Sequence, residues 1–324
     1  MEPLISIYGT VFNNANVIRK SIDSIISKLP DFKKRFEMVI VDNYSSDGTY
    51  EILKEYQKEY PNITLIQKKC TRGKGRAIAF NNTKGKYVLT IDFDTIYLEP
   101  FKNIVYSYKR IKPLEIYPMF MMKRETMDIV GNWKDLNVAE DTEMLARAIS
   151  KNVKIYTYPI IFALNQISRE REKRYAKRID YYIRLIRTYA DYTAGAGLNY
   201  KDFKKRFNRL NSFELFLGYL IIRLIHYKIF RYDKNYDNSL LIQKRIIYPD
   251  PKRLNIPYKY YVTGFREGYF EEEKIRKFKN FGLDKSIKIT GDKRTFVIMY
   301  NKKADIKIIN YYKRYFTNTK FRTW

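Results

Sequence analysis

The stretch that decides the fold of this chain reads KYVLTIDFDTIY and covers residues 86–97. Its strand-forming residues, Tyr87 to Ile91, lead directly into Asp92 and Asp94. Side chains two residues apart in an extended chain point to the same side, so the two carboxylates can share one site at the end of a strand. Carboxylate oxygens suit Mg²⁺ or Mn²⁺, which can also hold a diphosphate. The alternative is that the two aspartates only start a turn.

Further apolar runs before this stretch predict a parallel sheet. They cover residues 4–8, 36–41 and 63–66, and helical periodicity fills the intervals between them. Strands that alternate with helices form parallel sheets wound by right-handed crossovers. Asp42 ends the second run, so we expect it on the same edge of the sheet as the aspartate pair, where open α/β sheets bind ligands. This geometry indicates a nucleotide site, although the sequence contains no Walker loop and no Rossmann glycine motif.

Several short segments, in this order along the chain, resemble the catalytic domain of inverting, family 2 type glycosyltransferases with the GT-A fold. The segments are ISIYGTVFNN at residues 5–14, VIVDNYSSDGT at 39–49, RGKGRA at 72–77, DFD at 92–94, and GNW at 131–133 followed by EDTE at 140–143. The resemblance covers residues 4–147 and implies an α/β fold with a mainly parallel sheet flanked by helices. One departure is Tyr8-Gly9-Thr10, which replaces the usual proline-containing turn.

The resemblance implies a role for each matching residue. Asp42 would accept a hydrogen bond from the nucleobase, and Asp94, with Asp92, would hold the Mn²⁺ or Mg²⁺ cofactor. The residues that would bind the donor, a UDP- or GDP-linked sugar, are Thr10, Phe12, Asn13, Asp42, Lys74, Arg76, Asp92 and Asp94. Simpler roles stay open, because Asp42 can cap the chain after a strand and Lys74 and Arg76 can form a solvated helix start.

Asp141 is the candidate general base of the implied reaction. It would take the proton from an acceptor hydroxyl as that oxygen attacks the anomeric carbon, while the metal stabilises the departing nucleoside diphosphate. One displacement inverts the stereochemistry, so the reaction needs no covalent intermediate. Glu140 and Asp141 can also form an acidic first helix turn that offsets the macrodipole, and this agrees with the catalytic role.

The acceptor or phosphate side of the site is expected to include Trp133, Glu140 and Arg174. We interpret Trp133 as an aromatic platform for a sugar face, with plain core packing as the alternative. Arg174 lies in REKRY at residues 171–175, which has the spacing of a family segment but ends in Tyr instead of Trp. The favoured interpretation of that segment is the exposed face of a basic helix, with Arg174 kept as a phosphate contact.

Composition sets the wider frame. The chain has 324 residues and a formal net charge of +28, and a field of that sign attracts nucleic acid, anionic lipid or a phosphorylated carrier lipid. The single cysteine rules out an intrachain disulfide and agrees with a cytoplasmic location. The first strand begins close to Met1, so we expect no signal peptide. Peripheral attachment to the inner face of the membrane stays open.

Three regions are expected along the chain: a GT-A catalytic core at residues 1–165, a basic and amphipathic helical region at 166–232, and a small α+β accessory unit at 233–324. The apolar segment 213–230 contains charged residues that argue against a membrane span. It is therefore either an interfacial helix, which would contact anionic membrane, or a buried packing helix. The accessory unit is expected to contain strands at 260–265, 287–289 and 296–300 and a helix at 271–281.

The predicted function is that of a metal-dependent glycosyltransferase of the hexosyltransferase type. It would transfer a sugar to a hydroxyl of a glycan or lipid-linked acceptor. Transfer to a polyprenyl phosphate at the membrane surface is one alternative, and such an acceptor is already ionised and needs no base. A basic, polyanion- or nucleic-acid-binding protein on an α/β scaffold is another. Carboxylates on one edge repel phosphates unless a cation is present, so we expect no nucleic-acid partner. A nucleotidylyltransferase would need a glycine-rich first loop, which is missing.

Overall fold

The computed structural model describes the first part of the chain almost without interruption and the rest in short ranges. The described residues are 4–158, 160, 162–165, 183, 186–191, 211–224, 246–247, 251–257, 260, 262–264, 287–289 and 295–300. The strands up to residue 165 are β1 (Ile5–Val11), β2 (Phe36–Asp42), β3 (Ile63–Gln67), β4 (Tyr87–Thr90), β5 (Thr95–Tyr97), β6 (Glu115–Ile116), β7 (Met122–Lys123), β8 (Lys154–Tyr156) and β9 (Ala163–Asn165). The α-helices are α1 (Ala15–Ile26), α2 (Phe32–Arg35), α3 (Thr49–Glu59), α4 (Arg72–Asn81), α5 (Glu99–Tyr106), α6 (Arg124–Val130) and α7 (Glu140–Ser150).

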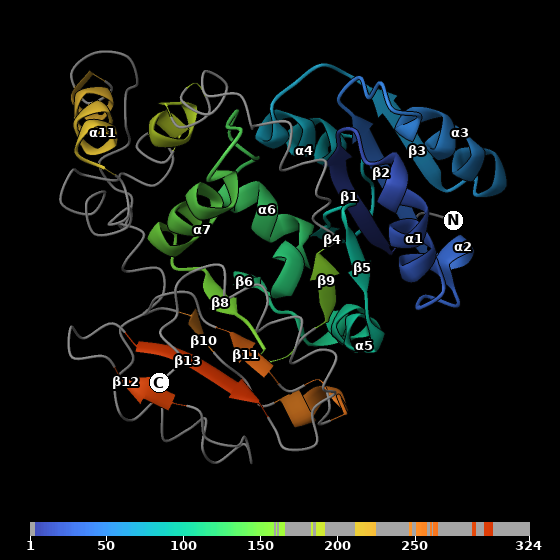
Figure 1. The fold of residues 1–324 in the computed structure, drawn as a ribbon. Coiled ribbons are helices and arrows are strands. Elements are labelled where there is room, and N and C mark those ends of the chain that lie inside the picture. The colour runs from blue at the N-terminus through green and yellow to red at the C-terminus, as the bar shows by residue number, and fades with distance from the viewer. Residues whose placement is uncertain are drawn as a thin grey trace.

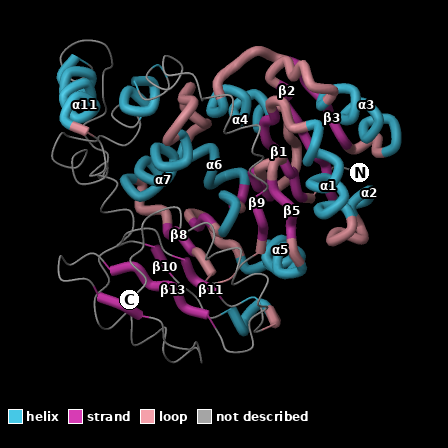
Figure 2. The backbone as a smooth tube through the Cα atoms, in the orientation of Figure 1, coloured by secondary structure: helices cyan, strands magenta, loops and turns pink. Residues whose placement is uncertain are grey.

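The central sheet has the strand order β3-β2-β1-β4-β7 (Figure 1). The first four of these strands run parallel and β7 is antiparallel to β4. Each parallel step needs a crossover, and α1, α3 and α4 provide them (Figure 2). The predicted α/β architecture, with a mainly parallel sheet flanked by helices, is confirmed.

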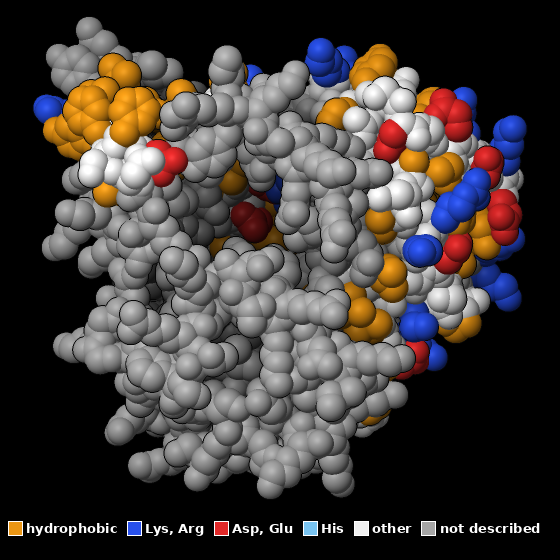
Figure 3. Space-filling view, viewed as in Figure 1, with side chains coloured by type: hydrophobic (Ala, Val, Ile, Leu, Met, Phe, Trp, Pro, Cys, Tyr) orange, Lys and Arg blue, Asp and Glu red, His pale blue; other side chains and the backbone are white. Residues whose placement is uncertain are grey.

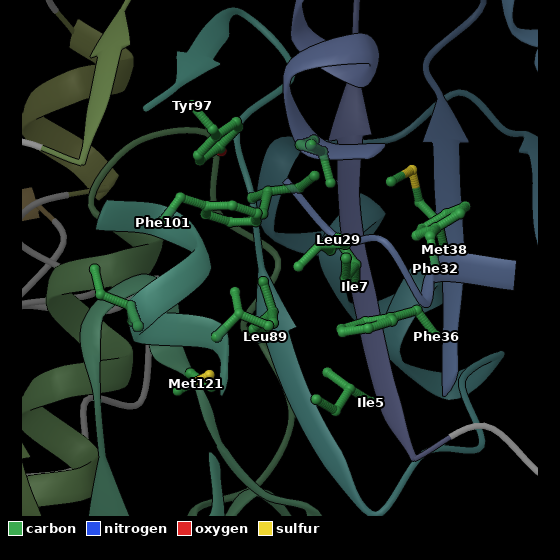
Figure 4. Close-up of a cluster of buried hydrophobic side chains, with 14 of the residues drawn as sticks. Ile5, Ile7, Leu29, Phe32, Phe36, Met38, Leu89, Tyr97, Phe101 and Met121 are labelled. Carbon is green, nitrogen blue, oxygen red and sulfur yellow. The ribbon is translucent and has the colours of Figure 1, made fainter. Parts of the chain in front are cut away.

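Two hydrophobic clusters cover the two faces of this sheet. Ile5 and Ile7 of β1 lie in the larger cluster (Figure 4), to which the apolar stripe of α1, Ile18, Ile22 and Ile25, also belongs. Tyr8 of β1 belongs to the second cluster, on the other face of the sheet, together with residues of α4, α6 and α7. Both faces of the central strands are therefore buried, which explains why these strands are apolar without strict alternation.

Smaller sheets surround this core. Strand β8 lies between β6 and β10 (Ile246–Ile247), and β5 pairs antiparallel with β9. Near the carboxyl end, β13 (Thr295–Tyr300) lies between β11 (Val262–Gly264) and β12 (Ile287–Ile289), antiparallel to both. The three strands predicted for the accessory unit are therefore present, the first one shorter than expected. The helix predicted at 271–281 lies outside the described residues, and the boundaries of the three regions stay a prediction.

Helix α11 (Ser212–Leu224) falls within the segment predicted to be interfacial or buried. Its exposed apolar side chains are Phe213, Phe216, Leu220 and Leu224, and Figure 3 shows hydrophobic side chains gathered over this helix. Glu214 is buried and pairs with Asn211 at the amino-terminal end. Within the ranges given above, no helix combines the length and the hydrophobicity that crossing a bilayer requires.

Candidate active site

The carboxyl ends of β2 and β4 bring the predicted acidic residues to one edge of the sheet. Both strands pair in parallel with β1, so Asp42 lies opposite Val11 and Thr90 opposite Tyr8. The amide of Ile91 donates to the carbonyl of Tyr8 at 3.0 Å, which keeps the chain beside β1 up to Asp92. This is the edge where open α/β sheets bind ligands.

Asp42 is completely buried at this edge, and its two carboxylate oxygens differ. Oδ2 accepts hydrogen bonds from the amide of Ser45 at 3.0 Å and from Nε2 of Gln67 at 3.1 Å. Oδ1 accepts none from the residues that the structure describes. The turn-capping role left open by the sequence is therefore real, and it uses only one oxygen. Gln67 was not identified from the sequence, because its partnership with Asp42 arises from the pairing of β2 with β3.

Asn13 and Asp47 hold the loops after β1 and β2 together. The amide of Asn13 donates to Oγ of Ser45, and its Oδ1 accepts from the amide of Ser46, both at 2.8 Å. Asp47 accepts from the amide of Ala15 at 3.0 Å. Burial favours the protonated form of Asp47, but hydrogen bonds from Thr49 and the backbone outweigh it and lower the pKa. The loops after β1 and β2, which are far apart in the sequence, are thus joined by hydrogen bonds beside Asp42, and we call this pair of loops the wall.

The other donor-side residues of this wall differ in exposure. Thr10 donates from Oγ1 to the carbonyl of Val41 at 3.0 Å, so its hydroxyl already supports the sheet. Phe12 follows β1 and its side chain is half exposed, and Lys74 is exposed in the first turn of α4. Phe12 and Lys74 are therefore the members of this set that a ligand can reach without displacing the protein.

Arg76 occupies the centre of the site, and it is neither solvated nor open to a ligand. Its side chain is 7% exposed. Nη2 donates to Oδ1 of Asp92 and Nη1 donates to Oε1 of Glu140, each at 2.9 Å. The ring of Trp133 lies 4.9 Å from the guanidinium carbon. Burial disfavours the charged guanidinium, but Asp92, Glu140 and Asp141 outweigh it and raise the pKa of Arg76.

Two glycines explain how α4 comes close enough for this contact. A Cβ on Gly73 would lie 2.0 Å from the carbonyl oxygen of Lys134, and one on Gly75 would lie 2.6 Å from Oγ1 of Thr10. The amide of Gly73 also donates to the carbonyl of Leu136 at 2.8 Å. The glycines of the RGKGRA segment therefore permit close packing of α4 on the loop before α7 and on β1.

Helix α7 begins with one buried and one exposed carboxylate. Glu140 is 2% exposed, and burial raises its pKa, although Arg76 and Arg72 oppose this shift. Asp141 is exposed, and its Oδ1 accepts from the amide of Thr142 at 2.7 Å. Asp141 is also close enough to Arg76 and Glu140 to interact with both electrostatically. Asp141, the candidate base, is therefore accessible to solvent and to a substrate. It lies next to the ion pairs that Arg76 forms with Glu140 and Asp92.

Trp133 and Glu140 do not have the surroundings expected of acceptor contacts. Trp133 is 5% exposed, and its Nε1 donates to the hydroxyl of Tyr8 at 2.9 Å. Phe120 packs edge-on against its ring and Arg76 lies over it, so the core-packing alternative is favoured over a sugar platform. Glu140 is enclosed by its pairing with Arg76. Arg174 lies outside the described residues.

Tyr97 fixes the turn that holds Asp92 and Asp94. Its hydroxyl accepts from the amide of Asp92 at 3.0 Å and donates to the carbonyl of Asp92 at 3.1 Å. Burial raises the pKa of this phenol well above its ordinary value, so it stays neutral and able to donate. Sequence reasoning missed Tyr97 because the sequence shows it only as a strand residue.

The aspartate pair fits a divalent cation that a substrate helps to hold. The side chain of Asp92 is 61% exposed and that of Asp94 is partly exposed. Strand β4 ends at Thr90 and residues 93 and 94 form a turn, so the extended backbone on which the same-side prediction rested is not present. Among the described residues, no group of three or more His, Cys, Asp and Glu side chains could hold a metal. Mg²⁺ is usually bound by one or two carboxylates together with substrate phosphates and water, and this donor set matches that pattern.

The loop between α6 and α7 is held by Glu143 of the EDTE segment, by Arg147 at the end of the resemblance, and by Asp191, to which the sequence did not point. Arg147 pairs with Glu143 and donates to the carbonyls of Val130, Gly131 and Asn132. From the far side, Oδ2 of Asp191 accepts from the amides of Asn137 at 3.0 Å and Val138 at 2.9 Å. These contacts position the amino-terminal end of α7 and therefore Asp141.

Comparison with known proteins identifies the region that forms this site. Residues 6–124 match the model of the family described as glycosyl transferase family 2. A poly(ribitol-phosphate) beta-glucosyltransferase of Bacillus spizizenii is 32% identical over 93 residues, which cover 28% of this chain and 14% of that protein. A dolichyl-phosphate beta-glucosyltransferase of Trichomonas vaginalis is 32% identical over 97 residues, which cover 28% of this chain and 30% of that protein. The aligned stretch thus spans less than a third of either relative.

Among solved structures, the mannosyltransferase PcManGT from Pyrobaculum calidifontis, in complex with GDP-Man and Mn²⁺, is 16% identical. The match covers 70% of this chain and 71% of that one, with a TM-score of 0.43, a likeness too distant to bear on the chemistry. The sequence match stands apart from it and coincides with β1 to β4, α4 and the aspartate turn. Over residues 6–124, this chain therefore resembles the glycosyl transferase family 2.

Proposed function

We propose that this chain is a metal-dependent, inverting glycosyltransferase that moves a sugar from a nucleoside-diphosphate sugar to an acceptor hydroxyl. The observation that supports this most is the convergence of carboxylates from three parts of the chain. Asp42 and the aspartate turn lie on one edge of the sheet, and Arg76 connects Asp92 to Glu140, beside Asp141. The family 2 match and the glucosyltransferase names of both relatives agree with this chemistry.

The donor nucleotide binds along the wall formed by the loops after β1 and β2. Oδ1 of Asp42 is an acceptor in need of a donor, and an N–H group of uracil or guanine supplies one. Lys74 offers a cation near the diphosphate, because it is exposed at the start of a helix on the same edge. Asp94 and Asp92 would hold a divalent cation, which would supply Lewis-acid stabilisation of negative charge on the leaving nucleoside diphosphate.

Asp141 accepts the proton of the attacking hydroxyl. The acceptor oxygen forms a bond to the anomeric carbon as the bond to the diphosphate breaks, so the configuration at that carbon inverts. Asp141 suits this role because its carboxylate is exposed, whereas Glu140 beside it is enclosed by an ion pair. A positioned general base contributes about 10² to 10⁴ in rate.

A second candidate is transfer to a polyprenyl phosphate at a membrane surface. The name of the Trichomonas vaginalis relative and the exposed apolar side chains of α11 favour it. A phosphate acceptor is already ionised, so the two candidates differ in their need for Asp141. An Asp141→Asn variant should lose transfer to a hydroxyl acceptor but keep transfer to a polyprenyl phosphate.

The proposed function is tested with the purified chain, a panel of UDP- and GDP-linked sugars and Mn²⁺. We expect one donor to raise the thermal midpoint only when Mn²⁺ is present, and that donor to be used in transfer to an acceptor with inversion. Asp94→Asn should abolish the metal-dependent part of the binding. Donor binding that is identical with EDTA and with Mn²⁺ would refute the metal role, and a product of retained configuration would refute the single displacement.

A further inference from the structure

The donor side and the base side of the site come from different parts of the chain, and one side chain contacts both. The aspartate turn follows β4, whereas Asp141 lies in the first turn of α7. Arg76, on α4, donates from Nη2 to Asp92 and from Nη1 to Glu140, each at 2.9 Å. The distance between the two sides therefore depends on the guanidinium group of Arg76.

This group is fixed in place. Its side chain is 7% exposed and that of Glu140 is 3% exposed, so water does not compete for their contact. The guanidinium carbon lies over the ring of Trp133, 4.9 Å from its centroid, and the indole in turn donates to Tyr8 of the central strand. A guanidinium presents its donors in a rigid planar fork, whereas a lysine ammonium is a single point charge on a flexible stem. Only the fork can hold two carboxylates at a set separation.

We propose that Arg76 is a positioning residue that sets the separation between the Asp92–Asp94 turn and the first turn of α7, so that the bound donor and the base Asp141 meet in a reactive arrangement. This rests on the proposed function. Arg76 contacts neither the reacting atoms nor the nucleotide; it acts through Asp92 and Glu140. Both of its terminal nitrogens are engaged by carboxylates, which leaves the phosphate contact expected from the sequence to Lys74.

The kinetic test compares Arg76→Lys with Arg72→Lys. Both changes keep a positive charge on α4, but the side chain of Arg72 is 47% exposed and, among the described residues, pairs with Glu140 alone, at 3.5 Å. A misplacement of about 1 Å can cost about 100-fold in rate. We therefore expect kcat to fall by about 100-fold in Arg76→Lys, with the donor Kd changed less than about tenfold, and both to stay within about twofold in Arg72→Lys.

The structural test measures amide hydrogen exchange on the free chain and needs no substrate. One fork holds both sides, so Arg76→Lys should speed exchange in peptides covering residues 92–97 and 139–143 together. Peptides covering β1 should keep their wild-type exchange rates. If Arg76 only stabilised the fold as a whole, exchange in β1 would become faster as well. Arg72→Lys should leave all of these peptides unchanged.

The outcomes separate the inference from the proposed function. If wild type turns over but Arg76→Lys keeps its kcat, or if only one of the two segments exchanges faster, the positioning role is overturned. If wild type itself neither binds donor nor turns over, the proposed function fails, while the exchange result still reports whether the fork couples the segments. Should Arg76→Lys not fold, the double variant Arg76→Met with Glu140→Gln removes both buried charges, and a folded double variant with wild-type kcat overturns the proposal.

Discussion

Replacing Gly73 by alanine should destabilise the protein, even though alanine is the better helix former. Gly73 lies in the first turn of α4, and its Cβ would be 2.0 Å from the carbonyl oxygen of Lys134, which is backbone and cannot rotate away. Relieving the contact also stretches the 2.8 Å hydrogen bond from the amide of Gly73 to Leu136. Overpacking of this kind costs about 1–3 kcal/mol, whereas the gain in helix propensity is at most about 1 kcal/mol.

Gly75→Ala is the matched control. It lies on the same helix and gains the same propensity, and its Cβ would lie 2.6 Å from Oγ1 and 2.9 Å from Cβ of Thr10, a less severe overlap than the 2.0 Å approach to backbone at Gly73. We expect Gly73→Ala to lose about 1–2 kcal/mol net and Gly75→Ala to lose less. For a protein of this size, the former corresponds to a fall in thermal midpoint of about 1.5–3 °C, measured by circular dichroism. A Gly73→Ala protein as stable as wild type, or more stable than Gly75→Ala, would refute the close-packing argument.

Two further predictions concern the acidic residues. Asp42→Asn should weaken binding of the preferred nucleoside diphosphate by about tenfold. The single carbonyl oxygen of the asparagine cannot both keep the contacts to Ser45 and Gln67 and accept a hydrogen bond from the nucleobase. Calorimetry that finds equal affinities would exclude the contact between Asp42 and the nucleobase. Burial raises the pKa of Glu140, so the folded state binds the carboxyl proton more tightly than the unfolded state does. The contribution of this proton to the free energy of unfolding is lost as pH rises from the ordinary carboxyl pKa through the raised pKa of the folded state. The thermal midpoint of Glu140→Gln relative to wild type should therefore increase across that window, and a constant difference would show that Glu140 does not titrate there.

The sequence was sufficient to predict the sheet and the residues on its edge. Apolar runs of strand length with helical intervals left a parallel sheet as the natural arrangement, and strand ends then located Asp42 and the aspartate turn. Asp141 was predicted as the general base from the resemblance of EDTE at residues 140–143 to a family segment, and its exposure in the first turn of α7 is compatible with that role, which stays a prediction. These inferences depend on local pattern and on which end of a strand a residue follows.

Contacts between distant segments could not be predicted in the same way. Arg76 follows a glycine-rich start of a helix, which reads as a solvated phosphate contact, and only packing against β1 and the loop before α7 turns it inward. Trp133 is open to either interpretation from sequence, because an aromatic residue after a turn can pack or stack; its burial and its hydrogen bond to Tyr8 favour packing. Tyr97 and Gln67 give no local signal, since their roles arise from chain reversal and from strand pairing.

The most direct test of the central claim is the separation of catalysis from donor binding in Asp141→Asn, with kcat and the Kd of the donor measured on the same preparation in Mn²⁺. We expect kcat for a hydroxyl acceptor to fall by at least about 100-fold while the Kd stays within about threefold, because in the proposed mechanism Asp141 removes a proton and does not bind the donor. Unchanged turnover, or loss of turnover and donor binding together, would contradict the account.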